Sequence, residues 1–128
     1  MKIIECVPNF SEGRDTALIK EITDAIESVS GITLLDVDPG IDTNRTVVTM
    51  VGDPESIIEA AFLGIKKGSE LIDLRNHGGA HARMGATDVC PFVPISETSM
   101  DDCIKYSKIL AKRVGAELNI PVFLYEFS

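Results

Sequence analysis

The sequence has no tryptophan, only three cysteines, and no apolar run of the roughly 18–20 residues that a membrane-spanning helix needs. The cysteines, at positions 6, 90 and 103, are an odd number without paired spacing, which argues against a disulfide framework and favours a reducing compartment. The apolar stretch after Met1 is too short for a signal peptide. We therefore expect a cytoplasmic protein with no membrane partner.

Basic residues are also scarce, because 12 Lys and Arg face 20 Asp and Glu and leave a formal net charge of −8. A chain this acidic repels phosphate backbones, so nucleic acid is not an expected partner. The 128 residues are 45% hydrophobic, which supplies enough apolar surface for a core. This length predicts one domain covering residues 1–128.

Gly, Pro and Asp divide the chain into alternating apolar segments. Strands are expected at Lys2–Val7, Ile32–Asp38, Arg45–Gly52, Ala86–Val93 and Pro121–Phe127, and helices at Asp15–Val29, from Asp53 to about Ile72, and from about Thr98 to about Glu117. The short connection between the second and third strands predicts an antiparallel pair. The order predicts an α+β fold, a ferredoxin-like βαββαβ unit with an extra αβ unit, whose helices pack on a mixed sheet.

Local signals place the helix ends. Asp53-Pro54-Glu55 is a strong helix start, and Gly31 is a suitable C-cap for the first helix. Thr98-x-x-Asp101 resembles a capping box with Asp in place of the usual Glu or Gln. Residues 73–85, with three glycines, are expected to form a loop, and Pro91 is expected at an edge or a bulge.

The first polar segment, Pro8–Arg14, lies between a strand and a helix. Asn9, Ser11 and the nearby backbone amides could hold an anion or a polar ring before the helix. The alternative is a routine loop that caps the helix N-terminus.

The second polar segment, Asn76–Asp88, contains both histidines of the protein, His77 and His81, together with Arg83. Histidine moves protons near neutral pH, and glycines allow the backbone to approach a ligand. The His-x-x-x-His spacing aligns metal ligands only on a helix, which Gly78-Gly79 disfavours, so no metal is expected. Two ordinary loop histidines are the alternative.

Strand alternation places Asp36 and Asp38 on one face at the end of the second strand. Asp38 could orient a histidine through its ring N–H, or could only cap the Pro39-Gly40 turn. Arg45 and Arg83 could receive carboxylates, or could form only surface salt bridges. Neither Ser11 nor any cysteine has an evident activating base, so none is read as a nucleophile.

Four blocks of sequence resemble the glutamate formimidoyltransferases, or formiminotransferases. These blocks are Ile4–Gly13, Leu34–Asp38, Thr43–Val47 and His81–Pro94, and Val122–Tyr125 resembles the strand that follows in the family. The resemblance covers the N-terminal subdomain of that family. Ala80 and Ala82 depart from it, because the family commonly has an acidic residue and a proline at these positions.

The resemblance implies transfer of a formimino group from formiminoglutamate to tetrahydrofolate during histidine degradation, with tetrahydrofolate as co-substrate and no metal. It places the catalytic histidine at His81 and its partner carboxylate at Asp38. Asn9, Ser11, Arg45, His77 and Arg83 are then the candidate substrate- and folate-binding residues. Folate would lie against a second αβ subdomain, supplied by further sequence or by a separate chain, without which we expect little or no activity.

Two other functional classes remain open at this stage. One is a stand-alone folate-binding or regulatory module without turnover, and retention of His81 and Asp38 argues against it. The other is a structural oligomer of ferredoxin-like sheets. Bare edge strands would favour pairing between copies, so a homo-oligomer, most simply a dimer, is expected.

Overall fold

The computed structural model describes the backbone of residues 1–76 and 87–118, and the side chains of residues 1–72 and 90–118. The described elements alternate between strands and helices along the chain. They are β1 (Ile3–Cys6), β2 (Asn9–Phe10), α1 (Thr16–Glu27), β3 (Ile32–Gly40), β4 (Arg45–Gly52), α2 (Pro54–Asn76), β5 (Thr87–Val89), β6 (Phe92–Ser96) and α4 (Met100–Leu118).

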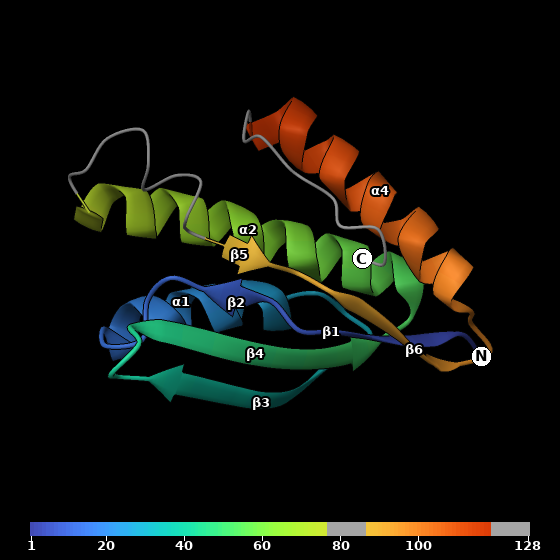
Figure 1. Cartoon of the computed structure of the whole chain (residues 1–128), viewed down its shortest axis with the longest axis horizontal. Coiled ribbons are helices and arrows are strands. Elements are labelled where there is room, and N and C mark those ends of the chain that lie inside the picture. The colour runs from blue at the N-terminus through green and yellow to red at the C-terminus, as the bar shows by residue number, and fades with distance from the viewer. Residues whose placement is uncertain (77–86, 119–128) are drawn as a thin grey trace.

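The strands form one sheet in which β4 is central (Figure 1). β3 pairs with one side of β4, and β1 and β2 both pair with its other side. β6 and β5 follow beyond β1 and β2 respectively. If β1 with β2, and β5 with β6, are each counted as one interrupted strand, this is the strand order of a ferredoxin-like βαββαβ unit. The structure therefore confirms the predicted fold class.

Every strand pair in the described ranges is antiparallel. The parallel strands of each βαβ unit are separated by a strand of the other unit, so they are not neighbours. The predicted mixed sheet requires a parallel pair, and none of the described pairs is parallel. The expected strand Pro121–Phe127 lies outside the described residues.

Two prolines interrupt neighbouring strands at the same level of the sheet. Pro8 separates β1 from β2, and Pro91 separates β5 from β6, because proline cannot donate a ladder hydrogen bond. Both proline carbonyls still accept backbone hydrogen bonds. The Val7 amide donates to the Pro91 carbonyl at 3.1 Å, and the Val48 amide donates to the Pro8 carbonyl at 3.0 Å. The predicted irregularity at Pro91 is confirmed, and β6 continues beyond the predicted end to Ser96.

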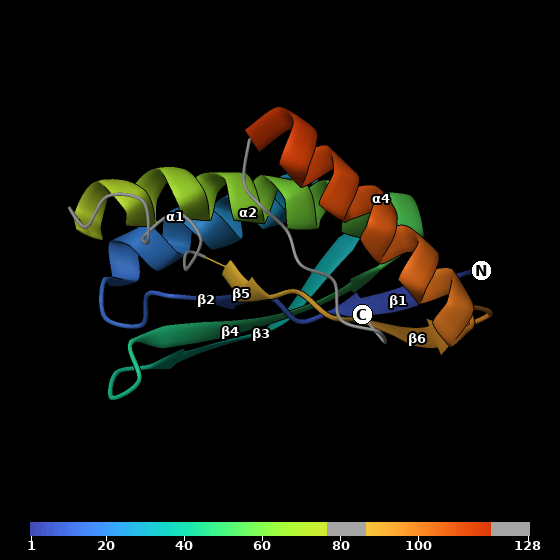
Figure 2. The ribbon, with the colours of Figure 1, turned by 45° about the horizontal axis from the view of Figure 1, so that its top comes forward.

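The three described helices cover one face of the sheet (Figure 2). α2 contacts both α1 and α4, and α4 also contacts β6. The core between helices and sheet contains fully buried residues from every layer, including Ile4, Ile26, Met50, Ile57 and Cys103. In β4, residues 46, 48, 50 and 52 are buried and 47, 49 and 51 are half-buried, so alternate side chains face the helices and the open face of the sheet.

Three predicted helix ends differ from the structure. The capping box belongs to Ser99 and Asp102, since the Ser99 amide donates to Asp102 and the Asp102 amide to Ser99 Oγ, both at 3.1 Å. Helix α1 ends at Glu27 with Ser28 as its C-cap, and Gly31, with φ +93°, instead serves the turn into β3. Helix α2 extends to Asn76, so residues 73–76 are helical, because neither Gly nor Pro occurs between Gly68 and Gly78.

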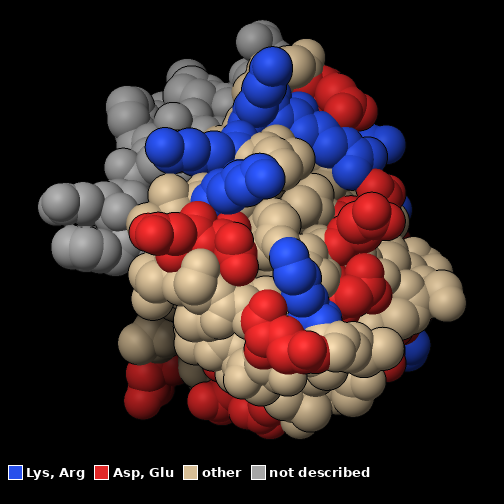
Figure 3. All heavy atoms as spheres, turned by 90° about the vertical axis from the view of Figure 1, so that its right-hand side faces the viewer, with Lys and Arg blue, Asp and Glu red and all other residues tan. Residues whose placement is uncertain are grey.

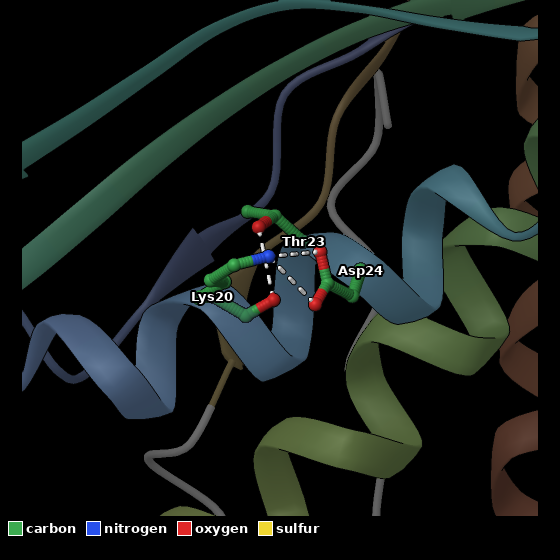
Figure 4. Close-up of polar contacts among 3 residues, drawn as sticks. All are labelled: Lys20, Thr23 and Asp24. Carbon is green, nitrogen blue, oxygen red and sulfur yellow. Dashed lines mark hydrogen bonds and ion pairs between the residues drawn. The ribbon is translucent and has the colours of Figure 1, made fainter.

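Charged side chains lie on the outer faces of the helices. Figure 3 shows basic side chains gathered over α4, with acidic side chains beside and below them. Lys105, Lys108 and Lys112 of α4 are exposed. On α1, Lys20 Nζ contacts both carboxylate oxygens of Asp24, at 3.1 and 3.0 Å, and Thr23 Oγ1 donates to the Lys20 carbonyl (Figure 4). None of the described helices is long and apolar enough to cross a membrane.

Candidate active site

Asn9 belongs to a strand and not to the capping loop that the sequence suggested. In β2, Asn9 pairs with Val47 on one side and Val89 on the other, while Phe10 is buried in the core. Because consecutive strand residues face opposite sides, Asn9 points away from the helices, and it is half-buried. Its Oδ1 atom is buried and accepts no hydrogen bond. A buried acceptor without a donor is costly, which marks this atom as one that a ligand could satisfy.

The strand register places Asn9 and Asp38 in one row across the sheet. Asp38 lies opposite Val47, Val47 lies opposite Asn9, and Asn9 lies opposite Val89. Neighbouring strands are about 4.8 Å apart, so Asp38 and Asn9 are separated by roughly 10 Å across the open face. The structure thus brings together two of the predicted site residues that are 29 positions apart in the sequence.

Asp36 and Asp38 share this open face, as predicted. They pair with Thr49 and Val47, which are two positions apart on β4, and both carboxylates are exposed. A register shift between Leu34 and Asp36 admits Leu35 as an extra residue. The alternative role of Asp38 as a cap of a Pro39-Gly40 turn is wrong, because both residues continue β3 and the turn falls at residues 41–44.

The segment after β2 is fastened to the β3–β4 turn by contacts that sequence reasoning missed. The Gly13 amide donates to Asn44 Oδ1 at 3.0 Å, and Arg14 Nε donates to the Ile41 carbonyl at 2.9 Å. A Cβ on Gly13 would lie 2.4 Å from the Gly40 oxygen, so only glycine fits. Asn44 has φ +54°, a conformation that asparagine tolerates well. The sequence signal for this turn was Asn44, within Thr43-Asn44-Arg45.

Glu12 is another residue whose role the sequence analysis missed. Its side chain is buried at 8% exposure, and its Oε2 accepts from the Arg14 and Asp15 amides, each at 2.9 Å. Thr46 Oγ1 donates to the Glu12 carbonyl from the neighbouring strand β4. Asp15, not Asn9 or Ser11, is the N-cap of α1 and accepts from the Leu18 amide at 3.1 Å. Protein carboxylates therefore already occupy these three amides, which weakens the hypothesis of an anion site before α1.

The remaining described candidates lie near the same row. Ser11 is half-buried directly after β2, and Arg45 is exposed at the start of β4, opposite Gly40. His77, His81 and Arg83 lie outside the described residues. The segment that contains them joins α2 to β5, and β5 pairs with β2 next to Asn9. Among the described residues, no three or more His, Cys, Asp or Glu are grouped to hold a metal ion.

Comparison with known proteins decides the family. A sequence model described as formiminotransferase domain, N-terminal subdomain, matches residues 3–128. The chain belongs to the formiminotransferase family. The resemblance noted in the four sequence blocks is therefore confirmed, and the fold described above is that of the N-terminal subdomain of a formiminotransferase.

Relatives of this formiminotransferase subdomain are longer proteins. It is 52% identical to the glutamate formimidoyltransferase of Streptococcus pyogenes serotype M1, covering 99% of this chain and 42% of that protein. It is 50% identical to the Thermoplasma acidophilum enzyme of the same name, covering 98% and 41%. The formimidoyltransferase-cyclodeaminase of Dictyostelium discoideum is 54% identical, covering 98% and 23%. The chain thus spans less than half of the curated relatives it matches.

Proposed function

We propose that this chain is the N-terminal catalytic part of a glutamate formimidoyltransferase, which transfers a formimino group from formiminoglutamate to tetrahydrofolate in histidine degradation. The observation that carries the proposal is the row joining Asp38, Asn9 and β5. This row assembles the predicted partner carboxylate, an unsatisfied buried acceptor and the strand that directly follows the segment containing His81. Two relatives are named glutamate formimidoyltransferase, which supports transfer of a formimino group to or from glutamate.

Chain length allows His81 to reach Asp38. His81 is six positions before Thr87 at the start of β5, and an extended chain spans up to about 20 Å over that length. Asp38 and Val89 are three strand spacings apart, which is roughly 14 Å. A hydrogen bond from the ring N–H of His81 to the Asp38 carboxylate would hold one tautomer of the imidazole and stabilise the imidazolium.

The proposed chemistry needs one proton acceptor that later becomes a donor. The N5 nitrogen of tetrahydrofolate attacks the formimino carbon and gives a tetrahedral intermediate. His81 takes the proton from the attacking nitrogen and returns it to the departing amine of glutamate, so the imidazole ends in its starting state. Such acid–base catalysis typically contributes about 10²–10⁴-fold, and orientation of the two substrates supplies the rest.

The other candidate residues bind rather than react. Arg45 and Arg83 would hold carboxylates of glutamate or of the folate tail through paired N–H donors. Asn9 Oδ1 would accept a hydrogen bond from an N–H group of the folate ring, and Ser11 and His77 would line the same site. The remaining length of the relatives supports a second subdomain that completes the cleft.

The test is a chimera in which this chain replaces the matched segment of the Streptococcus pyogenes relative. We expect formimino transfer in the chimera, and a loss of about 10²–10⁴-fold in kcat in His81→Ala, with tetrahydrofolate binding retained. Asp38→Asn should lower kcat and shift its pH profile. Lys20→Ala, on the outer face of α1, is the matched control and should leave both unchanged.

Two results would contradict the proposal. Unchanged turnover in His81→Ala would remove the acid–base role of this residue. Tight tetrahydrofolate binding by the folded chimera without any turnover would instead support the folate-binding module.

We also propose that the protein is cytoplasmic.

We further propose that two copies of the chain pair through β3. This edge strand carries Leu35 at 55% exposure, and the adjoining turn carries Ile41 at 69%. Edge strands with exposed apolar side chains favour association. Light scattering should give a dimer mass, and Leu35→Lys should lower it; a monomer mass at high concentration would contradict the pairing.

A further inference from the structure

Cys6 and Cys90 are 84 positions apart in the sequence, yet their sulfur atoms are 3.2 Å apart. Cys6 ends β1 and is fully buried, whereas Cys90 lies between β5 and β6 and is half-buried. Cys6 pairs with Phe92, and Cys90 lies two positions before Phe92, diagonally opposite Cys6. The proposed transfer reaction uses neither thiol.

We propose that Cys6 and Cys90 form a reversible oxidation site, at which a hydroperoxide converts the two thiols into a disulfide. The site does not depend on the proposed transferase function, because it rests on the two sulfur atoms and their surroundings alone.

The two sulfur atoms are already in contact at 3.2 Å. A disulfide has a sulfur–sulfur distance of about 2.05 Å, so the two atoms need to approach by only about 1 Å. The Val7 amide donates to the Pro91 carbonyl at 3.1 Å, so the backbone beside Cys6 and the backbone beside Cys90 are held next to each other. Cys103, on α4, is the third free cysteine and is buried in the core, which makes it an internal control.

The difference in exposure between the two thiols sets the order of the steps. Cys90 is the more accessible thiol and attacks the peroxide oxygen, giving a sulfenic acid and releasing one water molecule. Cys6 then attacks the Cys90 sulfur, forms the sulfur–sulfur bond and expels the second water. In total, two thiols lose two electrons and two protons, and one peroxide is reduced to two waters.

Burial explains why Cys6 follows Cys90. Desolvation, together with the neighbouring Cys90 thiol, raises the pKa of Cys6 well above its ordinary value, so Cys6 holds little thiolate when water and peroxide are outside. Cys6 therefore reacts with an electrophilic sulfur that lies in contact with it, which is the sulfenic acid sulfur of Cys90. Burial also raises the pKa of Cys103, which has no such neighbour among the described sulfurs.

The experiment exposes this chain to hydrogen peroxide, blocks free thiols with an alkylating agent under denaturing conditions, and maps the peptides by mass spectrometry. We expect a single peptide pair linked through Cys6 and Cys90, two hydrogen masses lighter than the separate peptides, with Cys103 fully alkylated. Treatment with dithiothreitol should restore both thiols. Cys103→Ser should give the same cross-link, and Cys90→Ser should give none and leave Cys6 as a free thiol.

Three outcomes would overturn the proposal. The first is that peroxide leaves both thiols free under conditions that oxidise a small dithiol. The second is over-oxidation of Cys90 to a sulfinic acid without a cross-link. The third is a cross-link that joins two chains or includes Cys103. Circular dichroism of Cys90→Ser, compared with Cys103→Ser, checks that the variants are folded.

Discussion

Asn9 and Asp38 lie in one row of the sheet, each two strands from the other with Val47 of β4 between them, and both on the face that the helices leave open. The sequence separates them by a helix and most of a strand. Their shared row follows from the strand order, which places β4 between β2 and β3. A ligand lying across this row would meet a buried carbonyl oxygen at one strand and a carboxylate at another.

The unsatisfied oxygen of Asn9 predicts opposite effects on stability and on binding. Replacing an amide whose buried oxygen has no partner by an apolar group of similar shape removes the desolvation penalty of that oxygen, so Asn9→Leu should leave the free energy of unfolding unchanged or raise it by about 1 kcal/mol. The same substitution should weaken tetrahydrofolate binding by about tenfold or more in the chimera. Urea unfolding and calorimetric titration measure the two effects. A Leu variant that is strongly destabilised would show that Asn9 has a structural partner.

The close approach of Gly13 to the turn after β3 predicts a large effect of a single methyl group. In Gly13→Ala, Cβ would meet backbone atoms of Gly40 and Arg45 at 2.4–2.6 Å, and backbone cannot rotate away. We expect a loss of roughly 1–3 kcal/mol in the free energy of unfolding. The matched control is Gly115→Ala, at an exposed position of α4, which should gain about 0.5–1 kcal/mol. Equal effects of the two alanines on urea unfolding would contradict the close approach.

The capping box of α4 predicts which hydroxyl stabilises that helix. Ser99→Ala should lower the free energy of unfolding by about 1 kcal/mol, because the Asp102 amide loses its acceptor. Thr98→Val removes only a 3.3 Å bond from Thr98 Oγ1 to the Ile3 carbonyl and should cost less. Chemical unfolding of both variants decides between them, and a larger loss in Thr98→Val would favour the box expected from the sequence.

The hydrogen bonds of the Asp53 carboxylate predict that part of the free energy of unfolding depends on pH. The Ser56 hydroxyl donates to Asp53 Oδ1 at 2.6 Å and the Ser56 amide to Oδ2 at 3.1 Å, and these bonds lower the pKa of the Asp53 carboxyl. A carboxyl with a depressed pKa in the folded state stabilises above its unfolded pKa, near 3.9, and loses this contribution as the pH falls through the lower folded value.

Asp53→Asn should therefore destabilise the protein at neutral pH by more than it does at pH 2–3. Unfolding measured between pH 7 and pH 2 tests this difference. Asp24→Asn, at the exposed pair with Lys20, is the matched control. A constant difference between the wild type and Asp53→Asn over this range would contradict the assignment.

The sequence predicted the elements whose patterns are local. The strand at Arg45–Gly52 and the start of α2 after Asp53 were predicted because alternation and an Asp-Pro helix start act within a few residues. Asn9 and Asp38 were proposed as candidate site residues through a family resemblance and through strand alternation. The sequence did not predict that these two residues share a row of the sheet, because strand order depends on pairings between segments far apart in the chain.

The errors also have local causes. Thr98 and Ser99 are adjacent hydroxyl residues, and Asp101 and Asp102 are adjacent carboxylates, so two capping boxes fit the same sequence. Asn9 was read as a loop residue because Pro8 precedes it, and a strand of two residues has no periodicity to detect. Glu12 gave no signal, because its burial arises from a turn that the sequence alone does not define.

The fastening of the segment after β2 to the β3–β4 turn has a thermodynamic consequence for recognition. Through Gly13, Asn44 and Arg14, the two backbone segments next to the row of Asn9 and Asp38 are held together before any substrate arrives. The conformational entropy of aligning them is lost during folding and not during association. A ligand that bound across the row would therefore not pay that ordering penalty, and the spacing between Asn9 and Asp38 would be fixed before it bound.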